Sequence, residues 1–369
     1  MKKIPYARQW ISEEDISAVA EVMRGDWLTT GPMVEKFEQE IAKYVGVKYA
    51  VAVNSGTSAL DIAVGAMELP KKSEIITTAF SFAASSNCIL YNNHTPVFAD
   101  IDPDTFNINP DEIKKKITEK TKAIIYVDYA GEPCEIDEIM EIASEHGLLL
   151  IDDAAHALGA EYHGKKVGRF ADMTEFSFHP VKQITSGEGG MVVTNNEEFA
   201  AKLRMLRNHG IDKTPGERKG YAYNMKMLGK NYRIADIQCA LGISQLKKIE
   251  LFLQRREEIA KKYSEVFSKV PGITPQKLED GVRHAWHLYP VLVENMERDL
   301  FFSKMRENGV EVNVHYLPIY SFEYYQKMGY RSLPVTDKVS SKIVSLPMFP
   351  KMEDTEVNKV IETVKKIMK

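Results

Sequence analysis

The feature that most constrains this chain is a regular alternation of short apolar runs with amphipathic helical stretches. Near-continuous apolar runs are typical of parallel strands that are buried on both faces. Helical patterns such as Ser58–Glu68 and Glu135–Glu145 lie between them. We therefore predict an α/β fold, with a mostly parallel sheet between helices and with strands at Tyr49–Val53, Glu74–Thr78, Pro96–Ala99, Ala123–Val127, Leu148–Ile151, Thr174–Phe178 and Met191–Thr194.

The pattern changes after about residue 245. From there we expect a long charged helix, a half-buried strand, a helix, a second strand and a last helix, at Lys247–Lys269, His287–Glu294, Arg298–Asn308, Val310–His315 and Glu353–Met368. A length of 369 residues suits two domains. We predict a large domain over residues 1–245 and a smaller C-terminal α+β domain over residues 246–369. Near the start, Ser12 followed by Asp15 predicts a capping box.

Composition excludes several classes of function. The chain has 48 Lys and Arg against 52 Asp and Glu, a net charge of -4, so no basic surface for nucleic acid is expected. Cys88, Cys134 and Cys239 lie far apart, which argues against a disulfide framework, and no cluster has metal-ligand spacing. No run approaches the ~18 apolar residues of a membrane span, and the basic N-terminus lacks the apolar core of a signal peptide. We expect a cytoplasmic protein without metal, membrane or nucleic acid.

Lys182 is the first candidate for chemistry. It follows Ser177 by five positions, and Phe178, Val181 and Ile184 place apolar side chains around it. Such surroundings disfavour the charged form of a lysine, and a free amine is the nucleophile that carbonyl chemistry needs. The alternative is an ordinary solvated charge.

Two further candidates lie at predicted strand ends. The segment Asn54–Leu60 offers Gly56, hydroxyls and N–H groups at a helix start, which suit a phosphate or only cap the helix. Asp152 and Asp153 end an apolar strand, where an unpaired charge is costly. One of them could pair with a cationic heterocycle, although a structural role or a metal pair stays open.

Other side chains have two interpretations each. Phe82 could stack on a flat ring or belong to the core. Asn231, expected at a helix start, could contact an anion or cap the helix. His315, expected at a strand end, could bind a ligand or be structural.

Taken in order, these motifs resemble the DegT/StrS-type nucleotide-sugar aminotransferases, which are pyridoxal 5'-phosphate (PLP) enzymes of aminotransferase fold type I. The resemblance rests on Asn54–Leu60, Phe82, Asp153–His156, Ser177–Lys182, Gly187–Gly190 and Asn231–Arg233, and it extends from Ile4 to Pro347. Each motif is weak alone, but six in the same order are specific.

The resemblance implies a role for each motif. Lys182 matches the catalytic lysine that binds the cofactor covalently, and Asp153 matches the carboxylate on its ring nitrogen. The remaining cofactor contacts are His156 beside the ring, Phe82 stacked on it, and Gly56, Thr57, Ser58 and Ser177 around its phosphate. Asn231 matches an amide that reaches the other subunit's cofactor, which implies a homodimer with shared sites. Thr29, Thr30, His315 and Tyr316 match segments that line the nucleotide-sugar cleft.

The expected reaction follows from the same resemblance. It is transfer of an amino group, from L-glutamate, to C4 of a UDP-linked 4-keto-6-deoxy sugar, as on the route to pseudaminic acid. Alternatives are an acceptor of the 4-aminoarabinose or perosamine type, or a non-catalytic sensor with this fold. Two departures from the family pattern affect local contacts: Lys230 replaces an aromatic residue before Asn231, and Tyr320 replaces a histidine.

Overall fold

The structure is a computed structural model that describes residues 3–213 and 220–369. Its largest sheet has the strand order β1-β9-β8-β5-β4-β2-β3. β9 runs antiparallel to β1 and β8, and the other neighbouring pairs are parallel. This confirms the predicted mostly parallel sheet, whose strands are β1 (Tyr49–Val53), β2 (Glu74–Thr78), β3 (Thr95–Ala99), β4 (Thr121–Val127), β5 (Leu149–Asp153), β8 (Met173–Ser177) and β9 (Gly190–Thr194).

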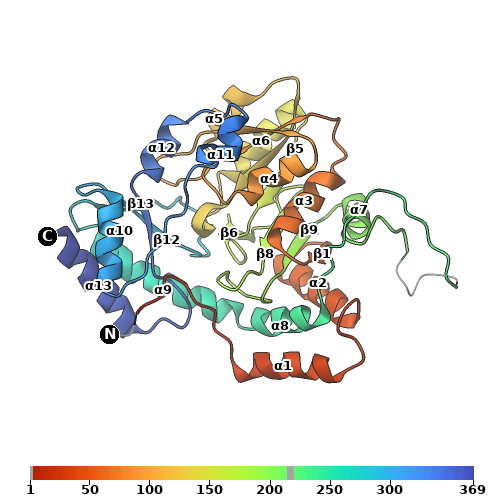
Figure 1. Ribbon diagram of the computed structural model, residues 1–369, viewed down its shortest axis with the longest axis horizontal. Helices are drawn as coiled ribbons and strands as arrows, with labels where there is room; N and C mark the ends of the chain where they lie inside the picture. Colours follow the sequence, from red (N-terminus) through yellow and green to blue (C-terminus); the bar gives the residue numbers. More distant parts are fainter. Residues whose placement is uncertain (1–2, 214–219) are drawn as a thin grey trace.

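Helices cover both faces of this sheet (Figure 1). One face packs against α3 (Gly56–Ala66), α4 (Ala84–Tyr91) and α7 (Glu197–Arg207), and the other packs against α2 (Pro32–Val45), α5 (Pro110–Lys116), α6 (Ile136–His146) and α8 (Asp236–Leu246). Side chains alternate between these faces along each strand. On β8, Met173 belongs to the core beneath α3, whereas Phe176 belongs to the core beneath α2 and α8.

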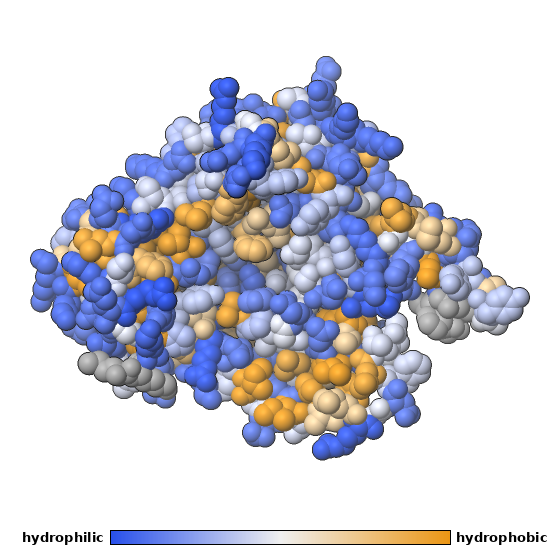
Figure 2. Space-filling model, viewed as in Figure 1, coloured by the Kyte–Doolittle hydropathy of each residue, from blue (hydrophilic) through white to orange (hydrophobic). Residues whose placement is uncertain are grey.

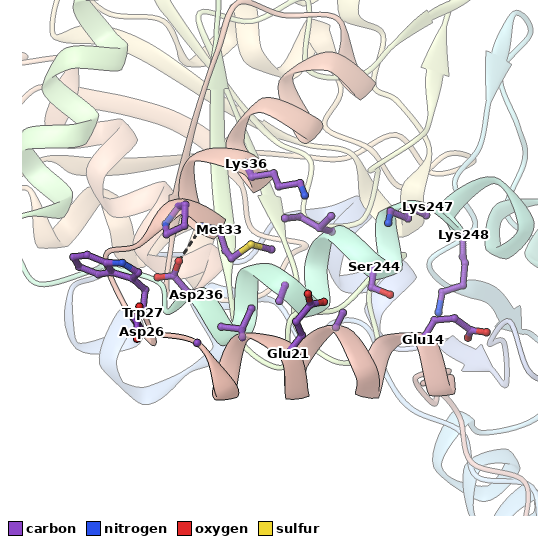
Figure 3. Close-up of a pocket in the computed structure, with 16 residues that line it drawn as sticks. Glu14, Glu21, Asp26, Trp27, Met33, Lys36, Asp236, Ser244, Lys247 and Lys248 are labelled. Atoms are coloured by element: carbon purple, nitrogen blue, oxygen red, sulfur yellow. Dashed lines mark hydrogen bonds between the residues drawn. The ribbon is translucent and has the colours of Figure 1, made fainter. Parts of the chain in front are cut away.

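The helix α1 (Glu13–Arg24) lies along α8. The Ser12 N–H donates to Asp15 Oδ2 at 2.9 Å, so the predicted acid reaches back to the helix start. Residues of α1, α2 and α8 line a groove of about 750 Å³, and Trp27, Lys36 and Asp236 are among them (Figure 3). No candidate residue named above lies in its lining.

A second core surrounds a small antiparallel sheet of β10 (Ile273–Pro275), β12 (Tyr289–Val293) and β13 (Ile343–Leu346). It is covered by α9 (Ile249–Phe267), α10 (Arg298–Glu307) and α13 (Asp354–Met368). Ile4 belongs to this core, so the N-terminal segment packs with the C-terminal elements. The domain boundary near residue 245 stays a prediction. None of the described helices combines the length and apolar character that crossing a membrane requires.

Short elements connect these layers. They are η1 (Tyr129–Gly131), η3 (Ile319–Ser321), α11 (Glu323–Lys327), α12 (Pro334–Ser340), and a further small sheet of β6 (Glu161–Tyr162), β7 (Lys165–Lys166) and β11 (Val282–Arg283).

The strand predicted at Val310–His315 is wrong. Val310 and Asn313 form only isolated bridges, to Ile4 and Ser345. Val310 and Val312 are buried, so the alternation reflects a half-buried extended segment, but no neighbour runs beside it long enough to form a ladder. The helix expected from Lys247 begins at Ile249, and β13 was not predicted.

Candidate active site

A cleft of about 890 Å³ opens beyond the carboxyl ends of the parallel strands, where open α/β sheets hold their ligands. Its lining includes ten of the thirteen predicted site residues: Gly56, Thr57, Ser58, Phe82, Asp153, His156, Ser177, Lys182, His315 and Tyr316. The fold therefore brings together most of a set that is spread over more than 250 positions of sequence.

Lys182 lies on a turn that follows β8. The Lys182 N–H donates to the carbonyl of His179 at 3.0 Å, and Ser186 N–H donates to the carbonyl of Phe178 at 3.1 Å, which closes the turn. Burial lowers the pKa of Lys182 to about 8, although the nearby carboxyl groups of Glu175 and Asp153 oppose this shift. The apolar surroundings predicted from sequence thus have the expected effect on the amine.

The lowered pKa predicts early acylation of Lys182. A lysine reacts with acylating reagents only as the neutral amine, so its labelling rises with pH through its pKa. In cofactor-free protein, Lys182 should be half-reactive near pH 8, well below the ordinary lysine pKa of about 10.4. Pulse acylation at graded pH, followed by peptide mass spectrometry, measures the pH midpoint of labelling for Lys182 and for exposed lysines in the same sample. Equal midpoints would contradict a buried amine.

The structure distinguishes the two adjacent aspartates. Asp153 lies on the α3 side of the sheet and lines the cleft, where Ser85 Oγ donates to its Oδ2 at 2.6 Å and the Ala155 N–H to its Oδ1 at 3.3 Å. Burial raises the pKa of Asp153, while these donors and Lys182 oppose that rise. Asp152 faces the opposite side of the sheet, where burial raises its pKa well above the usual range. Asp153 is therefore the carboxylate available to a ligand.

The start of α3 forms a narrow turn against β8 and β9. Ser55 Oγ accepts from the Ser58 N–H at 3.1 Å, and the first N–H groups of a helix have no acceptor within it. A Cβ at Gly56 would clash with Glu175 Oε1 and lie 3.2 Å from Ser177 Oγ, and one at Gly190 would clash with the Ser55 carbonyl. Only glycine allows these close approaches, which leave the N–H groups and hydroxyls facing the cleft.

Two aromatic residues and a histidine form another part of the cleft wall. His156 Nδ1 accepts from the Ala130 N–H at 3.3 Å, so the ring proton lies on Nε2, which is 3.1 Å from Tyr316 Oη. Burial lowers the pKa of His156 well below its usual range, and the ring is neutral. Phe82 is 63% exposed, with its ring centroid 6.5 Å from that of Tyr316. An exposed aromatic ring at a cleft mouth is suited to stacking rather than to core packing.

His315 is buried and has partners on both ring nitrogens. Its Nδ1 lies 2.8 Å from Ser345 Oγ, and its Nε2 lies 3.1 Å from Asn313 Nδ2. Contact with a sugar nucleotide through His315 stays a prediction.

Thr29, Thr30 and Asn231 are absent from the lining of this cleft in the described residues. Asn231 forms a bridge with Asn208 and is followed by an extended segment, so the helix start expected there is wrong: α8 begins at Asp236. Thr29 forms a bridge with Ala235 of the same segment. Asp236 fixes the turn after Thr30, because its carboxylate accepts from the Gly31 N–H at 2.8 Å and from the Met33 N–H at 2.9 Å. Figure 3 shows the second of these hydrogen bonds. The side chains of Thr29, Thr30 and Asn231 are all exposed.

Several site residues were not predicted from sequence. Ser85 was missed because a serine within a helix has no sequence signal that marks it as a site residue. His287 was missed because a single histidine next to an apolar strand has none either. Glu175 could have been found, because it precedes Ser177 by two positions on a strand and must share its face.

The residues present fit PLP. The α3 turn with Ser177 offers N–H and hydroxyl donors for a phosphate, Asp153 offers a carboxylate for a ring nitrogen, and Lys182 offers an amine of lowered pKa for an aldehyde. Asn54 Oδ1 is buried among them without a partner in the described structure, which leaves an acceptor for a ligand or water.

Residues 9–365 match the DegT/DnrJ/EryC1/StrS aminotransferase family. The chain is 38% identical to a UDP-4-amino-4,6-dideoxy-N-acetyl-beta-L-altrosamine transaminase of Campylobacter jejuni, over 99% of this chain and 97% of that one. Among solved structures it is similar to Helicobacter pylori PseC, an aminotransferase involved in the biosynthesis of pseudoaminic acid, with a TM-score of 0.95, 37% identity and coverage of 100% and 99%.

A sugar aminotransferase of Streptococcus pneumoniae, described as putative and named Spr1654, is also similar. In its PMP form it gives a TM-score of 0.95 and 31% identity, with 99% of each chain covered, and it is also solved in a PLP form. The fold and cofactor expected from sequence are thereby confirmed. This chain is a PLP-dependent enzyme that belongs to the DegT/DnrJ/EryC1/StrS aminotransferase family.

Proposed function

We propose that this enzyme transfers the amino group of L-glutamate to C4 of a UDP-linked 4-keto-6-deoxy sugar, as on the route to pseudaminic acid. The sugar's keto oxygen is exchanged for the amino group, and glutamate becomes 2-oxoglutarate. The observation that carries the proposal is the convergence of Lys182, Asp153 and the α3 turn on one cleft. The activity for which the C. jejuni relative is named supports the sugar and the nucleotide.

Each of these residues has a distinct task. Bound PLP supplies an electron sink that stabilises negative charge at the substrate carbon. Lys182 would hold the cofactor's aldehyde carbon and move a proton at Nζ, for which a pKa of about 8 is well matched. Asp153 would keep the ring nitrogen protonated. Neutral His156 donates from Nε2 to Tyr316 Oη, which leaves the Tyr316 hydroxyl proton to face the ligand.

The proposal includes a homodimer with shared sites. Lys182 is the only lysine or arginine among the described lining residues, yet the ligands are a phosphate and a nucleoside diphosphate. We define the arm as residues 208–213 and 220–230, which project beside α7 (Figure 1). The arm exposes Lys213 and also Lys226, which pairs with Asp212 of the arm at 4.0 Å. Supplied by a second copy, it would add the missing cations, together with Asn231 at its base.

Exposed apolar surface also favours association. The arm exposes Tyr221 at 94% and Leu228 at 86%. Figure 2 shows apolar groups gathered in its lower part, where α1 lies in Figure 1. On α1 and the following turn, Ile16, Met23 and Trp27 are exposed. Contiguous exposed apolar groups of this kind are typical of interaction sites. Thr29 and Thr30 follow these residues, so a dimer could also place them at the other subunit's cleft.

Subunit mixing tests the shared site. Lys182→Ala and Asn231→Ala should each be inactive alone, whereas an equal mixture should recover about one quarter of wild-type activity, because half the dimers are mixed and each has one intact site. The matched control mixes Lys182→Ala with the Lys182→Ala/Asn231→Ala double variant, which offers no intact site. Recovery equal to the control would place Asn231 within its own chain's site, whereas an active Asn231→Ala variant would place it outside any site.

The substrate is tested with a panel of 4-keto sugar nucleotides and glutamate. We expect the UDP-linked 4-keto-6-deoxy-N-acetylhexosamine to give the highest kcat/KM, measured by the 2-oxoglutarate formed. A GDP-linked perosamine precursor or a UDP-linked 4-aminoarabinose precursor is expected to react at least about tenfold less efficiently, the effect of about 1.4 kcal/mol of differential binding. A reversed order would replace the proposed substrate while keeping the enzyme class.

A further inference from the structure

Glu175 is a buried acid of the cleft whose position neither the reaction nor packing explains. It is fully buried on β8, and both carboxyl oxygens lack a hydrogen-bond partner in the described structure. An unpartnered buried carboxyl is costly. Since Glu175 lines the cleft, this cost suggests a task in the site.

Three contacts define the surroundings of Glu175. Across the strand pair its neighbour is Asp153, in parallel register. On the helix side its Oε1 lies close enough to Gly56 that a Cβ there would clash with it, at the start of the α3 turn. From the turn after β8, the charge of Lys182 acts on Glu175. Glu175 thus lies between the residue expected at the cofactor's ring nitrogen and the turn expected at its phosphate.

Charge balance decides which of the two acids is ionised. Asp153 accepts hydrogen bonds from Ser85 and Ala155, which favour its charged form, while Glu175 accepts none. When two buried carboxyl groups lie side by side and only one lysine is near, ionising both is costly, because the two negative charges repel each other. Burial raises the pKa of Glu175 well above its usual range, and Asp153 raises it further. A proton on this pair therefore belongs on Glu175.

The phosphate turn leads to the same assignment. The positive end of the helix dipole at the N-terminus of α3 stabilises a bound anion. The phosphate of PLP is the anion expected there. An ionised Glu175 beneath the turn would repel it. A neutral Glu175 does not, and its O–H has the Asp153 carboxylate as the adjacent acceptor.

We propose that Glu175 is a positioning residue that stays protonated and donates a hydrogen bond to Asp153, so that the negative charge stays on Asp153 beneath the cofactor's ring nitrogen. Glu175 touches neither substrate nor the reacting atoms and acts through Asp153. The proposal rests on the expected pairing of Asp153 with PLP, but it does not depend on which sugar the enzyme uses.

Infrared spectroscopy of the cofactor-free protein at neutral pH tests the proton directly. Glu175→Gln removes the carboxyl while keeping a donor of similar shape. The wild-type-minus-variant difference should contain the C=O stretch of a protonated buried carboxyl, shifted in D2O. A carboxylate band in that difference would mean that Glu175 is ionised, and it would overturn the proposal without bearing on substrate or on Asp153.

Cofactor affinity tests the hydrogen bond. Glu175→Gln should keep the Kd for PLP within about threefold of wild type, whereas Glu175→Met, of similar volume but without a donor, should weaken it at least about tenfold, as expected for a bond to a charged acceptor. A purely structural role would affect both variants alike. Equal loss in both variants, or no loss in Glu175→Met, overturns the proposal. If Glu175→Met does not fold, the infrared band and the affinity of Glu175→Gln still decide.

Discussion

Lys182→Ala is expected to lower the rate of amino transfer at least about 10³-fold, because the covalent hold on the cofactor and the proton movement at Nζ are lost together. The fold should persist, since a turn closed by backbone hydrogen bonds carries this side chain. The measurements are kcat with saturating substrates, circular dichroism, and borohydride reduction of the PLP-loaded protein followed by peptide mapping.

A matched control separates this effect from loss of a positive charge. Lys247 is exposed at the junction of α8 and α9, far from the cleft lining, and Lys247→Ala should keep wild-type rate and labelling. In wild type, the reduced cofactor should be found on Lys182. Labelling of another lysine, or a Lys182→Ala variant with near wild-type rate, would contradict the assignment.

Asp153→Asn is expected to keep PLP bound but to lower kcat about 10²-fold or more, since an amide of the same shape cannot hold the ring nitrogen protonated. Asp152→Asn is the matched control. The Asp152 side chain faces away from the cleft, and burial raises its pKa well above the usual range. Because Asp152 is not among the residues that line the cleft, Asp152→Asn should change kcat less than about threefold. A larger loss in Asp152→Asn than in Asp153→Asn would reverse the choice between the two acids.

The layered sheet could be predicted because its signals are local. Each apolar run and each helical stretch is a continuous segment, and the bounds predicted for β1 and β2 agree with the structure. The choice of Asp153 over Asp152 came from the family resemblance. Alternation places the two acids on opposite faces of the strand, but both acids are buried, so alternation alone does not say which of them meets the cleft.

The remaining contacts depend on which segments meet in space. Nothing near Ser85 indicates its hydrogen bond to Asp153, which joins residues 68 positions apart. The half-buried segment at Val310–His315 alternates like a strand. It differs from a strand only because no neighbouring segment pairs with it continuously in the described structure. Asn231 was expected at a helix start, but backbone pairing with Asn208 holds it at the base of the arm instead.

The central claim is that this chain carries out amino transfer from glutamate to a keto sugar. A stoichiometric two-step titration of the PLP-loaded protein tests it most directly. Adding glutamate alone should abolish the visible absorbance of the PLP form and release one equivalent of 2-oxoglutarate per site; adding the UDP-linked 4-keto-6-deoxy sugar should then restore the absorbance with one equivalent of amino sugar. An unchanged spectrum with glutamate, and no 2-oxoglutarate, would contradict the account and favour a protein that binds ligands without turnover.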